Sequence, residues 1–348
     1  MADHSLQSGR LTELLSQITS SGVVGPRDLI FGSQDGLCYE TWMTGGRQNI
    51  FLASREGHWP LLKKFKDCGA DLGSFYEDCI KWSPLVTAAE HGRWEAVQFL
   101  VSAQVPLDQK SEEGKTAVCA AAQNNHHNLA LFLISKGASY GFPEKFPLLG
   151  AVEEGHIEMA QKLLALGHPV NEQNSYGLCP LMGAINHKGP KGQEHEVMLV
   201  KLLLAAGASV DVVDSAGISP LMLAVSKGKG RVGRVLLAAG ANVNHTAHDG
   251  SGALEAAAAR GSGPLLRMLL AAGAPPTPRA LAAALGGRSK RALCLLLKAD
   301  RPVAGRPSLL DAPWEGQPPL HRAARGGDVG LVKILLRKGA RPGAVGRG

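Results

Sequence analysis

Basic side chains gather in clusters near the C-terminal end of the chain, where they could bind an anionic partner. Residues 217–348 hold 20 Lys and Arg against 6 Asp and Glu, a balance of +14, whereas residues 1–216 have a balance of −7. Such asymmetry indicates an acidic partner or surface for the C-terminal part. The clustered residues are Lys227, Lys229, Arg231, Arg288, Lys290, Arg291, Arg322 and Arg325.

Three interpretations of these clusters stay open. They are a solvated rim of an arginine-rich chain, a surface that binds an acidic protein segment, or a surface that binds nucleic acid. Nucleic acid is disfavoured because no aromatic residues, which would stack on bases, interleave with the charges. If the clusters are only a rim, aromatic residues at the expected hairpin tips are the better anchors for a partner. These aromatic residues are Tyr140, Phe142, Tyr176 and Trp314.

Two glycine motifs could bind phosphate. Residues 228–233 read G-K-G-R-V-G and match the G-x-G-x-x-G pattern of dinucleotide-binding turns. Such a turn must follow a strand and open a helix, whereas this one follows an alanine-rich helical stretch. Residues 114–116 read G-K-T, like the end of a phosphate-binding loop, but Gln109 stands where that loop needs its first glycine. We therefore expect no nucleotide cofactor.

Histidines and cysteines could bind metal or act in catalysis. The histidine pairs are 126 with 127, 187 with 195, and 245 with 248, but a zinc site needs three or four converging ligands. The cysteines show no C-x-x-C pairing, and we expect reduced, buried, apolar residues at positions 38, 68, 79, 119, 179 and 294. No nucleophile has a base in a recognisable context. We therefore expect neither a metal site nor a catalytic site, and no enzyme activity.

A unit that repeats along most of the chain must position these residues. A Gly-Ala or its equivalent closes a leucine-rich stretch at positions 69, 104, 137, 167, 207, 240, 273, 300 and 339, and a step of 33 residues recurs. Pro-Leu precedes this close by 20 residues, as Pro220 precedes Gly240, with Ala117, Ala253 or Ala280 in the Pro place of weaker copies. In the fifth copy Pro180 precedes the closing Gly207 by 27 residues, which indicates a polar insertion of seven residues around residues 188–194.

Each copy of the unit predicts two short helices and a hairpin-like turn. Proline starts the first helix, where its missing N–H costs nothing. A glycine such as Gly261 reverses the chain, and the second helix carries a leucine ridge that a glycine such as Gly240 closes in a left-handed conformation. No copy can bury its own apolar face, so the copies must stack. Equivalent positions in stacked copies lie on one surface, so we expect the basic clusters to form a stripe.

This pattern resembles the ankyrin repeat. The T-P-L-H-x-A core of that family is closest to Pro318–Ala323, its G-H turn to Gly57-His58 and Gly155-His156, and its G-A-x-V-N close to Gly240–Asn244. The resemblance covers about residues 47–342. It implies an all-α solenoid of helix-turn-helix units joined by hairpin-like loops, which binds proteins on its concave side through hairpin tips and first helices.

We expect three parts in the chain. Residues 1–46 would hold an N-terminal helix, with Leu11 and Ile18 on its apolar side, that caps the array or docks a partner. Residues 47–342 would hold about nine copies, with degenerate first and eighth copies and an insertion in the fifth. Residues 343–348 would form a tail.

The sequence thus favours a non-enzymatic scaffold or adaptor that binds a partner protein on the concave and turn surface of the stack. The alternative is a substrate-recognition adaptor of a ubiquitin ligase, a class in which many ankyrin proteins carry a SOCS box, which is absent from this sequence. The chain has no run of 18 apolar residues and no secretory signal at Met1–Arg10. We therefore expect an intracellular protein, in the cytoplasm, the nucleus or both.

Overall fold

The computed structural model describes residues 50–67, 70–73, 83–111, 114–139, 146–187, 192–300 and 308–342. Its regular secondary structure is helical, and the described part contains only isolated bridges, such as Thr246 with Gly252, in place of strands. The all-α class is therefore confirmed. Within the same residues, no helix has both the length and the apolar character needed to cross a bilayer.

Some of the predicted features lie outside the described residues. They are the helix expected near Leu11, the tip aromatics Tyr140 and Phe142, the cysteines at positions 38, 68 and 79, and the tail at 343–348.

The chain forms two compact bodies, an N-terminal body (Met1–Ala151) and a C-terminal body (Val152–Gly348). The N-terminal body contains helix pairs in which α4 packs against α5 and α6, and α6 packs against α7. Its helices are α3 (Trp59–Asp67), α4 (Pro84–Glu90), α5 (Trp94–Ser102), α6 (Ala117–Gln123) and α7 (His127–Ser135), and residues 50–56 are also helical. Helix α8 (Pro147–Glu153) contains the boundary between the bodies.

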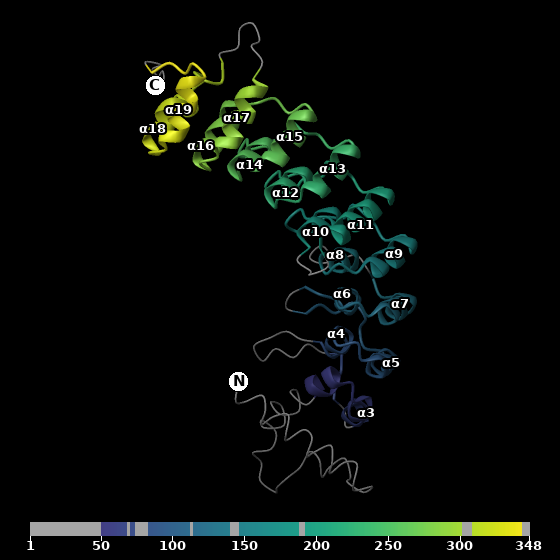
Figure 1. Cartoon of the computed structure of the whole chain (residues 1–348). Coiled ribbons are helices and arrows are strands. Elements are labelled where there is room, and N and C mark those ends of the chain that lie inside the picture. The colour runs from purple at the N-terminus through teal and green to yellow at the C-terminus, as the bar shows by residue number, and fades with distance from the viewer. Residues whose placement is uncertain are drawn as a thin grey trace, which may run out of the picture. The chain divides into compact units, whose positions relative to one another are not determined.

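The C-terminal body continues the helix pairs. Its helices are α9 (Ile157–Ala165), α10 (Pro180–Asn186), α11 (Gly192–Ala205), α12 (Pro220–Ser226), α13 (Gly230–Ala238), α14 (Ala253–Ala259), α15 (Gly263–Ala271), α16 (Pro278–Gly286), α17 (Lys290–Ala299), α18 (Pro319–Arg325) and α19 (Val329–Arg337). The first helices α10, α12, α14, α16 and α18 pack in one row, and the second helices α9, α11, α13, α15, α17 and α19 pack in another (Figure 1).

Local sequence signals explain where the helices begin. Prolines occupy the first turn of α4, α10, α12 and α18, as predicted. In α12 the hydroxyl of Ser219 also accepts a hydrogen bond from the Met222 amide. The eighth copy differs from the prediction, because α16 begins at Pro278 rather than at Ala280. The reason is that Thr277 caps the helix there by accepting a hydrogen bond from the Ala280 amide.

The core of the C-terminal body follows the leucine ridge of the second helices. Leu203, Leu236, Leu269 and Leu296 occupy equivalent positions and are fully buried. Burial of each such side chain contributes about 1.5–3 kcal/mol relative to its exposure to water. The closing glycines Gly240 and Gly273 have φ of +90° and +93°, which confirms the predicted left-handed conformation at the ends of α13 and α15.

The fifth copy accommodates its insertion partly as helix. Helix α11 has 14 residues, whereas the equivalent helices α13 and α15 have 9 each. Because α11 begins at Gly192, the extra residues lengthen the N-terminal end of the second helix. The remaining residues of the insertion, 188–191, lie outside the described part of the chain.

Candidate functional site

Three of the eight predicted basic residues lie in the turn between the two helices of a copy. Lys227 directly follows α12 and is exposed. Lys229 directly precedes α13, and its side chain is only 15% exposed because it reaches back to Glu196 of the preceding copy. Arg288, after α16, has φ of +51° and donates a long hydrogen bond of 3.4 Å to the Gly326 carbonyl of the next copy. Of these three side chains, that of Lys227 makes no hydrogen bond or ion pair with a described residue.

The other five predicted residues lie on helices. Arg322 and Arg325 belong to the first helix α18, and Arg322 Nη2 lies 2.8 Å from Glu315 Oε2. Arg231 is in the first turn of the second helix α13 and pairs with Glu194. Lys290 and Arg291 begin the second helix α17 and are exposed. The structure therefore places seven of the eight residues in the turns or at the helix ends beside them, whereas Arg322 lies in the middle of α18 and pairs with the hairpin before that helix.

The acidic residues of the same part of the chain are engaged at turns and helix starts. Asp328 caps α19 by accepting hydrogen bonds from the amides of Gly330 and Leu331. Glu255 accepts a hydrogen bond from the Gly252 amide at the start of α14. The other four carboxylates also have polar partners; they belong to Asp249, Asp300, Asp311 and Glu315. Carboxylates held in this way do not neutralise cations on the bodies of the second helices.

A second set of basic residues lies on the second helices and was missed by the sequence analysis. Arg234 precedes the closing Gly240 by six residues, and Arg267 precedes Gly273 by the same distance. Lys201 on α11 and Lys333 on α19 hold the equivalent place. All four side chains are exposed and make no hydrogen bond or ion pair with a described residue. Their fixed distance from the closing glycine is the sequence signal that could have revealed them. We call Lys201, Arg234, Arg267 and Lys333 the second-helix basic row.

Aromatic residues at the hairpin tips differ in exposure. Tyr176 is 69% exposed. The ring of Trp314 is half-buried, and the guanidinium carbon of Arg279 lies 5.2 Å from its centroid. Tyr176 is therefore the described tip residue that offers an unoccupied aromatic face to a partner, whereas Trp314 stacks within the array.

Three histidines lie against backbone carbonyls of the preceding copy. His245 Nε2 is 2.9 Å from the Gly217 carbonyl, and His187 Nδ1 is 2.9 Å from that of Glu153. His126 Nε2 makes a similar contact with Glu90, at 3.2 Å. Within the residues that the structure describes, no group of three or more His, Cys, Asp or Glu could hold a metal ion. These contacts give the histidines a role in stacking.

The cysteines match the expectation in part. Cys119 and Cys179 are buried, and burial raises the pKa of the Cys179 thiol above its ordinary value. Cys294 is exposed, so the expectation of a buried residue was wrong there. The reason is its place on α17, six residues before Asp300, which is the solvent-facing place that Arg267 holds on α15.

The G-x-G-x-x-G segment follows helix α12 rather than a strand. A Cβ atom at Gly233 would lie 2.9 Å from the Met268 side chain of the next copy. At Gly230 it would lie 3.3 Å from Leu265. These glycines therefore allow close packing of consecutive second helices, which accounts for the motif without a phosphate ligand.

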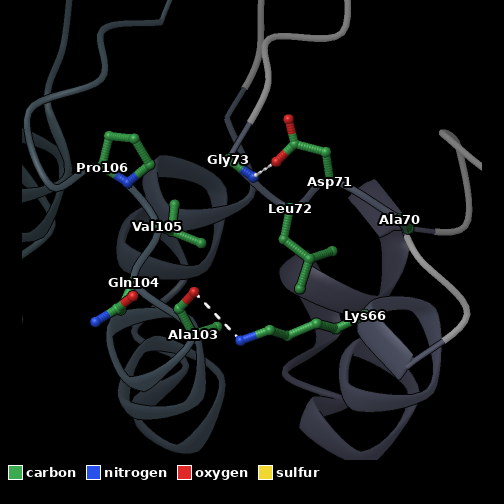
Figure 2. A pocket seen from close by; sticks show the side chains of 9 residues that line it. All are labelled: Lys66, Ala70, Asp71, Leu72, Gly73, Ala103, Gln104, Val105 and Pro106. Carbon is green, nitrogen blue, oxygen red and sulfur yellow. Dashed lines mark hydrogen bonds between the residues drawn. The ribbon is translucent and has the colours of Figure 1, made fainter.

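The N-terminal body contains a pocket of about 260 Å³ near the ends of α3 and α5 (Figure 2). Its polar groups bond to one another or to nearby backbone. Lys66 Nζ donates to the Ala103 carbonyl at 3.3 Å, and Asp71 Oδ1 accepts from the Gly73 amide at 2.8 Å. Leu72 and Val105 supply apolar lining. The residues that line this pocket include no Ser, Thr, Cys or His.

Comparisons with known proteins agree with the repeat pattern. The family model described as "Ankyrin repeats (3 copies)" matches residues 50–144 and 191–280, and that described as "Ankyrin repeat" matches residues 315–347. The chain is 31% identical over 134 residues to "Ankyrin repeat and KH domain-containing protein mask-1" of Caenorhabditis elegans. That match covers 37% of this chain and 5% of the relative, so the chain spans a small part of that protein.

A solved structure has a similar fold. The human ASB11 ankyrin repeat domain superposes with a TM-score of 0.53 at 24% sequence identity. The superposition covers 66% of this chain and 99% of the solved one. At this identity the likeness concerns the fold alone.

Proposed function

Because the chain belongs to the ankyrin-repeat family, we propose that it is a non-enzymatic scaffold or adaptor that binds a partner protein through the concave and turn surface of its C-terminal body. Ankyrin repeats are protein–protein interaction modules, and stacked copies present equivalent positions side by side. The partner surface in this proposal is led by Lys227, Lys229, Arg231, Arg288, Lys290, Arg291, Arg322 and Arg325.

The observation that carries the proposal is which side chains stay exposed to solvent when the copies stack. The leucine ridge is buried inside the array, whereas Lys227, Arg288, Arg325 and the tip residue Tyr176 stay exposed along the C-terminal body. Aromatic and arginine side chains are the residue types that dominate protein interfaces. His126, His187 and His245 bond to backbone carbonyls, which supports a structural role for these three histidines.

The positive charge of this surface would act mainly on the rate at which the partner associates. A single exposed ion pair contributes about 0.2–1 kcal/mol. Several cations of the same sign add to one field, which raises the rate of encounter with an acidic partner and is screened by salt. An adaptor of this kind should therefore bind its partner more slowly at high ionic strength.

Affinity capture from cells that express the protein tests the proposal. The parent chain should retain one or more proteins that the triple variant Lys227→Glu, Arg288→Glu and Arg325→Glu loses. A matched control reverses the exposed Lys63, Lys64 and Lys136 of the N-terminal body, which changes net charge equally. The control should retain the same proteins as the parent. Identical capture by the turn variant and the parent, or no specific capture by any form, would contradict the proposal.

A further inference from the structure

The outer side of four consecutive second helices carries charge of one sign. Helices α13, α15, α17 and α19 contain no Asp or Glu. Their basic residues are Arg231, Arg234, Arg267, Lys290, Arg291, Lys298, Lys333 and Arg337. The six acidic residues of 217–348 lie elsewhere, at turns, helix starts and hairpins. The excess positive charge of this part of the chain therefore lies largely on the second helices.

Most of these cations are free to meet a partner. Arg234, Arg267 and Lys333 are exposed and have no ion pair or hydrogen bond with a described residue. By contrast, the turn residue Lys229 pairs with Glu196, which leaves it little exposed. Arg234, Arg267 and Lys333 thus form a set of exposed, unpaired cations on the second helices, separate from the exposed cations at the turns.

Long side chains also cover the seams between these helices. A Cβ atom at Gly263 on α15 would lie 2.6 Å from Arg291 Nε, so the Arg291 side chain extends from α17 over its neighbour. Lys290 extends in the same way over Gly330 of α19. Gly263 and Gly330 have no side chain, so they leave room for Arg291 and Lys290 to extend over the neighbouring helix. Positive charge is therefore spread along the row of helices rather than confined to one point on each.

The spacing of the row fits an extended chain. Axes of packed helices are about 8–10 Å apart, so α13 to α19 span about 30 Å. An extended polypeptide advances about 3.3 Å per residue. Acidic side chains at about every third residue would therefore meet successive helices, and about ten residues would cover the row.

We propose that the second-helix face of the C-terminal body binds an extended acidic segment of a partner protein. This inference rests on the proposed function because both require a protein partner, but the residues that it adds, Arg234, Arg267 and Lys333, lie on the bodies of the second helices and not at the turns. A single-stranded nucleic acid fits less well, because α13, α15, α17 and α19 contain no aromatic residue on which bases could stack.

The test uses the full chain and a fluorescein-labelled decaglutamate peptide as the probe. Titration should show binding that weakens as salt rises. The triple variant Arg234→Glu, Arg267→Glu and Lys333→Glu should lose about tenfold or more in affinity, as three reversed exposed contacts allow. The control with Lys63, Lys64 and Lys136 reversed has the same net charge and should bind within about twofold of the parent. An equal loss in both would show a non-specific charge effect and overturn the proposal.

Further measurements distinguish the second-helix face from the turn surface, and a protein partner from nucleic acid or membrane. If the turn variant at Lys227, Arg288 and Arg325 loses the probe while the second-helix variant keeps it, this inference fails and the proposed turn surface stands. Failure of the cellular capture with the probe still bound to the second helices would instead reject the turn surface alone. Tighter binding of ten-nucleotide oligothymidylate, or of phosphatidylserine vesicles, than of decaglutamate would overturn the proposal in favour of nucleic acid or membrane. Circular dichroism checks folding, and the neutral variant Arg234→Gln, Arg267→Gln and Lys333→Gln replaces the reversal if that does not fold.

Discussion

Lys229 Nζ lies 2.7 Å from Glu196 Oε1 and joins two consecutive copies through an ion pair that is largely enclosed. The two side chains are 15% and 11% exposed. Glu196 precedes its closing Gly207 by eleven residues, and Lys229 precedes Gly240 by the same distance. The pair thus arises because stacking places one register position directly beside the same position of the next copy.

Loss of one partner of this pair should destabilise the C-terminal body. Lys229→Met leaves the Glu196 carboxylate buried without a counter-charge, and its Oε2 already has no hydrogen-bond partner among the described residues. We expect a loss of about 3 kcal/mol in the free energy of unfolding. The double variant Lys229→Met and Glu196→Leu should recover most of that loss, because neither charge then stays buried alone. Urea denaturation followed by circular dichroism measures both.

The exposed pair of Arg231 and Glu194 provides the matched control. These side chains join the same two copies but are 50% and 84% exposed. Arg231→Met should therefore cost less than about 1 kcal/mol. Equal losses for Lys229→Met and Arg231→Met would show that burial does not set the strength of these contacts.

The closing glycines should resist substitution for a conformational reason. Gly240 and Gly273 have positive φ, and a Cβ atom at either would meet nothing within 4 Å. Gly240→Ala and Gly273→Ala should each cost about 1–3 kcal/mol from backbone strain alone. Gly286, at the end of α16, also has open space but no positive φ, so Gly286→Ala should be neutral or slightly stabilising. Thermal melting compares the three, and a similar effect of all would exclude backbone strain as the cause.

Helix boundaries were largely predictable because their causes are local. Proline at the first turn and glycine with positive φ act on their own residues, so starts such as Pro220 and ends such as Gly240 can be read from the sequence. The eighth copy was predicted less well, because the Thr277 cap moves the start of α16 to Pro278. The helical extension of α11 was not predicted, since a polar insertion can form either a loop or another turn of helix.

The sequence predicts which basic residues belong to the candidate surfaces, but not which of them form ion pairs. Clusters such as Lys227 and Lys229 are visible in the sequence. That Lys229 is paired depends on Glu196, which lies 33 residues away and becomes its neighbour only through stacking. The second-helix basic row was not predicted, because Arg234 and Arg267 do not belong to a cluster of basic residues in the sequence. Each is a separate charge on its own helix.

Arg279 should stabilise the junction of three copies through geometry as well as charge. Its Nη1 donates to the Asp249 carbonyl at 2.6 Å, while its guanidinium lies over the Trp314 ring. A lysine keeps the charge but cannot make both contacts with one planar group. Arg279→Lys should therefore lower the melting temperature nearly as much as Arg279→Ala. If Arg279→Lys melts like the parent, charge alone accounts for the contact.

His168 should make the C-terminal body less stable in mild acid. It follows the closing Gly167 and is 5% exposed, and desolvation by burial lowers the pKa of its imidazole below the ordinary 6.5, against a smaller opposite effect of the Pro169 carbonyl. The unfolded chain therefore takes up a proton at this residue before the folded chain does. Linkage then requires the free energy of unfolding to fall as pH drops below about 6.5, until the lowered folded pKa is reached.

The variant His168→Asn isolates this contribution, because asparagine does not titrate. We expect the stability of the parent, measured by urea denaturation, to fall more steeply between pH 8 and pH 5.5 than that of the variant. Measurements at pH 8, where the imidazole is neutral in both states, give the cost of the substitution itself and serve as the reference. Other histidines and carboxylates titrate equally in both proteins, so they cancel in the difference. Parallel pH profiles for the two proteins would show that burial of His168 does not couple folding to proton uptake.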